Sequence, residues 1–178
     1  MAWALWFTGL PGSGKTALSK RTMNLLRRNG IRVKVLELDE IRRFVTPNPR
    51  YTDEERDIVY ASLAYMAKLL TESGMNVIID ATANRRRYRD LARSIIPDFA
   101  EVFVRCPLEL CMERERKRIA KFSPKGIYDR SAQPSATVPG VNVPYEEPLS
   151  PEIIIDSDRT DAFEGAEVVV KRLKEMFK

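Results

Sequence analysis

The chain has 178 residues, of which 44% are hydrophobic and 31% are charged, and its formal net charge is +5. This length and composition are typical of one globular domain with its own core, so we expect a single domain over residues 1–178. The chain has no run of 18 apolar residues and does not begin with a charged segment followed by an apolar stretch. We therefore expect no membrane span and no secretory signal, and we expect a cytoplasmic protein.

The ionisable residues exclude some kinds of chemistry. The chain has no histidine, which rules out imidazole metal ligands and histidine general bases. Its two cysteines, Cys106 and Cys111, are too few and wrongly spaced for a zinc site or a redox CxxC pair, so we expect them to be reduced and structural. The excess of basic residues suits a protein that handles anions, but it is too diffuse to indicate nucleic-acid binding by itself.

Segments typical of strands and helices alternate along the chain. The predicted strands are 2–8, 31–38, 76–80, 101–104 and 152–156, and the predicted helices are 16–29, 39–45, 52–73, 85–96, one that begins at 107, and 163–177. This alternation predicts an α/β fold with a five-stranded parallel sheet. Because the strands are largely apolar, we expect helices on both faces of the sheet, which makes a three-layer sandwich.

One region does not fit the regular pattern. Residues 120–150 are rich in proline and glycine, and an irregular stretch of this length in a compact domain usually has a function. We expect a lid or substrate loop over about 115–150.

The stretch "GLPGSGKT" at 9–16 matches the P-loop pattern G-x-x-x-x-G-K-[ST] and lies between a predicted strand and a predicted helix. Backbone N–H groups and the helix N-terminus can hold phosphate oxygens there. Lys15 would bridge the β- and γ-phosphates as a catalytic residue, and the Thr16 hydroxyl would bind Mg²⁺. The motif predicts ATP and Mg²⁺ as cofactors, with a nucleotide site made of Gly9, Leu10, Pro11, Gly12, Ser13, Gly14, Lys15 and Thr16.

P-loop proteins include kinases, GTPases, motor ATPases and regulators. The chain has no N-K-x-D guanine motif, and it is small for a motor protein. Its size and its expected lid favour a kinase for a small acceptor, so the fold is predicted to be P-loop kinase-like.

The stretch "LDEIR" at 38–42 provides candidate residues for the acceptor. Asp39 follows the second predicted strand, at the sheet edge where ligands bind in open parallel sheets. Asp39 and Arg42 are three residues apart and share a helix face. Asp39 could orient or deprotonate an acceptor hydroxyl and help to hold Mg²⁺, and Arg42 could bind an anion. The alternative is a helix-capping aspartate with a surface arginine.

Together these motifs resemble the adenylylsulfate kinase family of P-loop kinases. The resemblance extends over nearly the whole chain, which looks like a divergent member of that family. The resemblance implies phosphorylation of the 3′-hydroxyl of adenylyl sulfate to give 3′-phosphoadenylyl sulfate. It implies that Asp39 activates the hydroxyl and organises Mg²⁺. The segments that carry the resemblance are "LWFTGLPGSGKT", "LELDEIR", "YTDEER", "RRRYRDLAR", "EVFVRCPLELCMER", "PKGIYDRSA" and "PGVNVPYEEPLSPEIIIDSD". The acceptor-binding residues that it implies are Arg42, Tyr51, Arg56, Arg86 and Lys125.

Several positions depart from the family pattern. Glu37 and Leu38 replace the Asp-Gly of the family's D-G-D, and Val138 replaces a phenylalanine that stacks on the substrate base. The stretch "IIDATANRR" instead resembles polynucleotide kinases and other P-loop kinases. A kinase for another hydroxyl (a nucleoside, a metabolite or an RNA end) is therefore the alternative, and a non-catalytic nucleotide-binding regulator is a third option. The sequence leaves a homodimer open.

The sequence supports weaker predictions for three further features. The arginines between 85 and 93 are expected mostly on a solvated helix face. Arg114 or Arg118 could reach ATP. Asp80, at a strand end, is either a carboxylate that acts beside the P-loop or a structural residue.

Overall fold

The computed structural model describes residues 1–118, 126–134 and 136–177. Its five strands are β1 (Ala4–Thr8), β2 (Val33–Glu37), β3 (Asn76–Asp80), β4 (Phe99–Arg105) and β5 (Ile153–Asp156). They form one parallel sheet in the order β2-β3-β1-β4-β5. The predicted five-stranded parallel sheet is confirmed.

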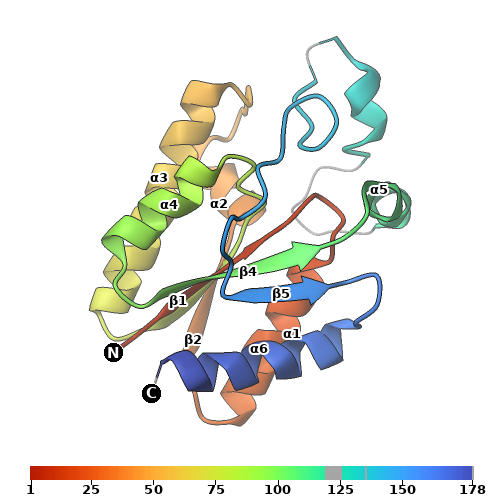
Figure 1. Ribbon diagram of the computed structural model, residues 1–178. Helices are drawn as coiled ribbons and strands as arrows, with labels where there is room; N and C mark the ends of the chain where they lie inside the picture. Colours follow the sequence, from red (N-terminus) through yellow and green to blue (C-terminus); the bar gives the residue numbers. More distant parts are fainter. Residues whose placement is uncertain (119–125, 135, 178) are drawn as a thin grey trace.

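Helices cover both faces of this sheet (Figure 1). On one face α1 (Lys15–Arg28) packs against α6 (Ala162–Met176), and on the other α3 (Asp53–Glu72) packs against α4 (Arg86–Ile95). The remaining helices are α2 (Leu38–Val45), α5 (Leu108–Lys117) and a short 3₁₀ turn, η1 (Asp129–Ala132). The predicted three-layer sandwich is therefore confirmed.

The sheet separates two apolar cores. The side chains of β1 alternate between them, with Trp6 on the side of α3 and α4, and Leu5 and Phe7 on the side of α1 and α6. All five residues of β1 are buried, because it is the central strand and has helices above and below it. This burial explains why its sequence is an apolar run rather than an alternation.

The second strand, which was predicted at 31–38, differs from the prediction at both ends. It spans only Val33–Glu37, and helix α2 begins at Leu38 with no intervening turn. The alternating pattern of the sequence continues into the helix, because Leu38 is buried there as it would be in a strand. This direct transition places Asp39 in the first turn of a helix at the sheet edge.

No helix in the described part of the chain is both long enough and apolar enough to cross a membrane.

Candidate active site

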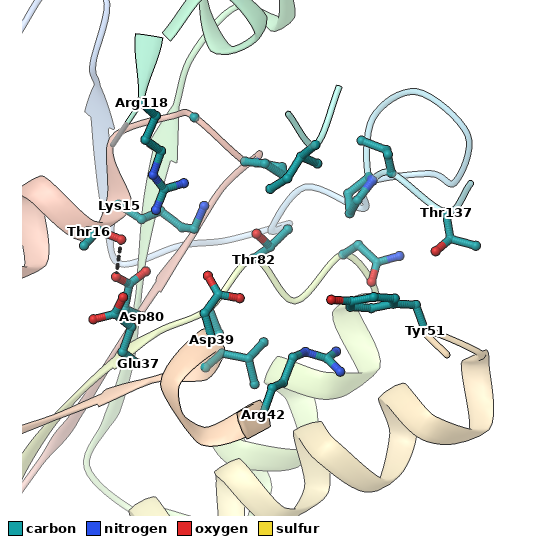
Figure 2. A pocket seen from close by; sticks show the side chains of 18 of the residues that line it. Lys15, Thr16, Glu37, Asp39, Arg42, Tyr51, Asp80, Thr82, Arg118 and Thr137 are labelled. Atoms are coloured by element: carbon teal, nitrogen blue, oxygen red, sulfur yellow. Dashed lines mark hydrogen bonds between the residues drawn. The ribbon is translucent and has the colours of Figure 1, made fainter. Parts of the chain in front are cut away.

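A cavity of about 850 Å³ opens at the edge of the sheet where the parallel strands end. Its wall comes from the P-loop, the start of α2, the loop after β3, the start of α3, the end of α5 and described residues within 127–134 and 136–139. Figure 2 shows Lys15, Thr16 and Asp80 at one end and Arg42, Tyr51 and Thr137 at the other, with Asp39 between them. The cavity thus joins the predicted phosphate site to the predicted acceptor site.

The P-loop takes the compact shape that its glycines allow. Gly12 and Gly14 have φ of +79° and +102°, in the left-handed region that favours glycine. A β-carbon on Gly12 would also collide with the backbone carbonyl of Cys111 in α5. Of the eight predicted nucleotide-binding residues, five line the cavity formed by the described residues: Pro11, Gly12, Gly14, Lys15 and Thr16. Gly9, Leu10 and Ser13 belong to the same loop but do not line that cavity.

Lys15 carries a buried amine at the phosphate end. Its Nζ donates to the carbonyl oxygens of Gly9 (3.0 Å) and Leu10 (2.9 Å), so the side chain lies over the loop that precedes it. Burial lowers the pKa of Lys15 from its ordinary value, and the nearby carboxylate of Asp80 opposes that shift. The amine is therefore placed where a phosphate group would gain much from its positive charge.

Asp80, the carboxylate at the end of β3, lies beside Thr16 of the P-loop. The Thr16 hydroxyl donates to Asp80 Oδ2 at 2.6 Å, and both residues line the cavity. Burial raises the pKa of Asp80, against the opposing effects of Lys15 and of the Thr16 hydroxyl. Glu37 of β2 lies opposite Asp80 of β3 in the sheet. Burial is the main cause that raises the pKa of Glu37, and the negative charge of Asp80 raises it further. The Thr16 hydroxyl and the carboxylates of Asp80 and of Asp39, which lines the same cavity, are hard oxygen donors of the kind that Mg²⁺ prefers.

Asp39 and Arg42 both line the cavity, so the alternative of a cap and a surface arginine is wrong. Asp39 is the second residue of α2, whose N-cap is Glu37. Arg42 is only 8% exposed, because it lies one turn further along the helix, between α3 and the cavity.

Tyr51 and Arg56 complete the predicted acceptor end. The guanidinium carbon of Arg42 lies 5.1 Å from the centre of the Tyr51 ring. Arg56 Nη2 donates to the backbone oxygen (2.8 Å) and to Oγ1 (3.1 Å) of Thr137. These bonds hold the segment around Val138, which is 7% exposed, against α3.

One predicted acceptor residue in the described part of the chain is not brought to this site. Arg86 is absent from the wall of the cavity that the described residues form, and its backbone N–H donates to Glu146 Oε2 at 2.8 Å. It is the first residue of α4, and its Nε lies 4.0 Å from Glu146 Oε2. Lys125 lies outside the described residues.

The expectation of a solvated arginine face on α4 is wrong for Arg89. Its side chain is completely buried, and its Nε donates to Glu101 Oε1 at 2.9 Å. The same guanidinium donates to the backbone oxygens of Ala83 and Glu146, and the bond to Glu146 is 2.7 Å long. The sequence did not indicate this burial, because Arg89 has the same charge as the neighbouring arginines, which are at least partly exposed.

Sequence reasoning gave less weight to three other residues of the wall. Arg114 and Arg118 line the phosphate end, as expected for residues that could reach a nucleotide. Arg114 also donates to the backbone oxygens of Ser13 (3.3 Å) and Ser157 (2.7 Å), which ties α5 to the P-loop and to the chain after β5. Asn84, in "DATAN", also lines the cavity. The position of that stretch directly after an apolar strand was the signal in the sequence that could have identified it.

Comparison with known proteins identifies the family. The family model for adenylylsulphate kinase matches residues 1–156. A probable adenylyl-sulfate kinase of Pyrococcus abyssi is 36% identical over 173 residues, which cover 97% of this chain and 95% of that protein. An adenylyl-sulfate kinase of a Picosynechococcus species is 34% identical over 173 residues, covering 97% and 93%.

Solved structures agree with the sequence comparisons. The APS kinase CysC of Mycobacterium tuberculosis, determined in complex with AMPPNP and APS, superposes with a TM-score of 0.85 at 30% identity, covering 97% of this chain and 98% of that one. The shikimate kinase of Aquifex aeolicus, at 14% identity and a TM-score of 0.56 over 97% and 96% of the two chains, shares the fold alone. By sequence and by structure, the chain belongs to the adenylylsulphate kinase family.

Proposed function

We propose that the chain transfers the γ-phosphoryl group of ATP to the 3′-hydroxyl of adenylyl sulfate, a step of sulfate assimilation. The bond between Pγ and the β,γ-bridging oxygen breaks, a bond from Pγ to the acceptor oxygen forms, and the products are ADP and 3′-phosphoadenylyl sulfate. The observation that carries this proposal is the single cavity in which the P-loop lysine faces the Arg42–Tyr51–Arg56 end across Asp39. The structure of the related APS kinase of M. tuberculosis is a complex with AMPPNP and APS, which supports ATP and adenylyl sulfate as the ligands here.

The phosphate end would bind ATP. The backbone N–H groups around Gly12 to Thr16 and the N-terminus of α1 would surround the phosphates. Lys15 would neutralise the negative charge that develops on the transferred group. Arg114 and Arg118 line the same end and would add positive charge beside the nucleotide.

Mg²⁺ fits the oxygen donors beside Lys15. The Thr16 hydroxyl and the carboxylates of Asp80 and Asp39 would hold it. When bound, the ion neutralises charge on the phosphate oxygens. Asp39 would also accept a hydrogen bond from the acceptor hydroxyl and take up its proton during transfer.

Arg42, Tyr51 and Arg56 would bind the acceptor. Two guanidinium groups suit an acceptor that carries a phosphosulfate, and the Tyr51 ring offers a flat face for a base. We propose residues 1–178 as one kinase domain, with 115–150 as its substrate segment. Arg118, Ile127, Arg130 and Val138 of that segment line the cavity. The two free cysteines accord with a cytoplasmic location.

A second acceptor class remains an explicit alternative, because Ala81, Thr82 and Asn84 of "DATAN" line the cavity and Val138 stands where a stacking aromatic would be. The test is a coupled assay of ADP release with ATP, Mg²⁺ and a panel of acceptors: adenylyl sulfate, nucleosides, sugar-type alcohols and an RNA 5′-hydroxyl end. We expect adenylyl sulfate to be the preferred acceptor, with the 3′-phosphorylated product identified by mass. Faster turnover of any other alcohol would replace the acceptor but retain the kinase, and no turnover of any acceptor would favour a regulator.

A further inference from the structure

Glu55 is a carboxylate behind the acceptor end of the cavity. It receives three backbone hydrogen-bond contacts from the two residues that precede the N-cap of α3. The N–H of Tyr51 donates to Oε2 at 2.6 Å, and the N–H of Arg50 is shared between Oε1 (3.0 Å) and Oε2 (3.1 Å). The same Oε2 lies 3.9 Å from Nη1 of Arg42 on the neighbouring helix. Three groups that line the cavity therefore converge on one side chain that does not line it.

The bonds of Glu55 go further than a helix cap requires. Thr52 and Glu55 have capping-box spacing, and Thr52 Oγ1 accepts from the N–H of Glu55 at 3.2 Å, as that motif predicts. In the usual motif the glutamate returns the bond to the N–H of its own cap residue. Here the carboxylate reaches past Thr52 to the turn at Arg50 and Tyr51 instead.

That turn has an uncommon backbone conformation. Tyr51 has φ of +57°, in the left-handed region that a bulky residue rarely adopts. Such a conformation persists only where its surroundings hold it in place, and it is found mainly at functional sites. It directs the ring of Tyr51 towards the guanidinium of Arg42 (Figure 2).

Arg42 is left with an unused donor. Among the described residues its Nη1 is buried and has no hydrogen-bond partner, because Glu55 at 3.9 Å lies beyond hydrogen-bond distance. The carboxylate is close enough to orient the guanidinium electrostatically while leaving this N–H for a ligand. Arg42 is thus held in place without being fully satisfied.

We propose that Glu55 is a positioning residue for the acceptor, which holds Tyr51 and Arg42 in a preorganised arrangement without touching the acceptor itself. The proposal rests on the proposed function, in which Tyr51 and Arg42 bind the acceptor. The carboxylate offers two oxygens to donors on both sides. A carboxamide at the same place would offer one oxygen and would turn its NH₂ group against another donor.

The test compares Glu55→Gln with Glu54→Gln, the same change at the exposed neighbour on the same helix. Glutamine serves in a capping box as glutamate does, so a residue that only caps α3 would tolerate Glu55→Gln. We expect the acceptor KM of Glu55→Gln to rise about tenfold or more, the effect of losing one charge-assisted hydrogen bond, with a smaller change in kcat. The KM for ATP should stay within about twofold of the parent value, and Glu54→Gln should match the parent in all three constants. An unchanged acceptor KM in Glu55→Gln, or equal rises in the KM for ATP and for the acceptor, would overturn the positioning role.

Amide hydrogen exchange measured by NMR keeps this test independent of the acceptor's identity. We expect the amides of Arg50 and Tyr51 to exchange at least about tenfold faster in Glu55→Gln than in Glu54→Gln, because one of their two acceptor oxygens is replaced by an NH₂ group and the negative charge is lost. Unchanged exchange would refute the contact on which the proposal depends. A parent enzyme inactive on adenylyl sulfate would refute the proposed acceptor alone, and the KM comparison would then use whichever alcohol the panel identifies.

Discussion

At the scale of single residues, the phosphate end of the cavity places charges where water has little access. Lys15 and Asp80 are both buried, and burial shifts the pKa of each towards its neutral form while the opposite charge of the other resists that shift. Electrostatic interactions are stronger in such a place than at the surface. The arrangement costs stability but suits the stabilisation of a transferring phosphoryl group.

Lys15→Ala tests this stabilisation directly. We expect turnover to fall by about a hundredfold or more, the range found for the loss of a single stabilising donor, because no other described residue projects an amine from the P-loop. Steady-state kinetics at saturating ATP and acceptor measure the effect. Turnover within a fewfold of the parent would contradict the assignment of Lys15.

Asp39→Asn keeps the shape of the side chain and removes its charge. We expect ATP still to bind, because Thr16 and Asp80 remain to hold Mg²⁺. Transfer should fall by about a hundredfold or more, because the acceptor hydroxyl loses its proton acceptor and Mg²⁺ loses one ligand. Nucleotide binding by calorimetry and turnover by the coupled assay separate the two effects. Equal loss of ATP binding and of transfer would show that Asp39 acts mainly on the nucleotide.

Glu37 allows a prediction about stability and pH. Burial and the charge of Asp80 raise its pKa above the ordinary value of 4.5 in the folded chain, so the folded chain binds this proton more tightly than the unfolded chain. The stability contribution of Glu37 therefore falls as pH rises from 4.5 through the folded-state pKa. Glu37→Gln mimics the protonated form, so we expect a higher Tm than the parent near pH 8 and no advantage near pH 4. Thermal denaturation across pH checks this, with Glu167→Gln on the exposed side of α6 as the control.

At the scale of elements, helix α4 is anchored by an arginine inside the protein. Arg89 joins α4 to Glu101 of β4 and holds the backbone oxygens of Ala83 and Glu146, one in the loop after β3 and one in the chain before β5. A completely buried guanidinium is tolerable only because its donors are used. This one side chain fixes the loop that carries Thr82 and Asn84 into the cavity wall.

Arg89→Met should destabilise the fold strongly. We expect the free energy of unfolding to fall by about 3–5 kcal/mol, because a buried carboxylate loses a partner and two backbone oxygens lose their donors. Arg87→Met makes the same change on the exposed side of the helix, where Arg87 pairs with Asp57, and should cost about 1 kcal/mol or less. Urea denaturation of both variants gives the comparison. If the two variants lost similar free energies of unfolding, the buried contacts of Arg89 would contribute no more to stability than the exposed ion pair of Arg87.

At the scale of the whole molecule, the cavity is assembled from segments that are far apart in the sequence. Thr137 and Arg56 are 81 positions apart, yet two hydrogen bonds join them and bring Val138 to the acceptor end. Val138 also packs on an apolar cluster with Cys111 and Tyr128. A larger side chain at this position therefore has room only towards the cavity.

Val138→Phe follows from that geometry. An aromatic ring here could stack on the base of a nucleotide acceptor, so we expect the KM for adenylyl sulfate to fall about three- to tenfold, the gain of one aromatic pair. The readout is formation of the 3′-phosphorylated product at saturating ATP, with the KM for ATP as the internal control. A higher acceptor KM in the variant would indicate that the ring obstructs the acceptor, and that this chain accepts a different group beside Val138.

The sequence by itself determined the order and type of the elements, the P-loop and the placement of Asp39 and Arg42 on one turn of a helix. Each of these depends on residues close together in the chain: the apolar runs of the strands, the glycines of the loop, and the capping pair Thr52 and Glu55. Such local patterns reflect backbone hydrogen bonding and periodic burial, which a short window of sequence contains.

Only the tertiary structure decided which distant residues meet. Thr16 and Asp80 are 64 positions apart, and they bond because β3 lies next to β1 in the sheet. Packing against β4 and the chain before β5 also buries Arg89, whereas Arg86 on the same helix is partly exposed and does not line the cavity. The residues next to them in the sequence do not indicate which elements pack against each face of α4. That packing determines whether an arginine of this helix is buried and fully hydrogen-bonded or exposed at the surface.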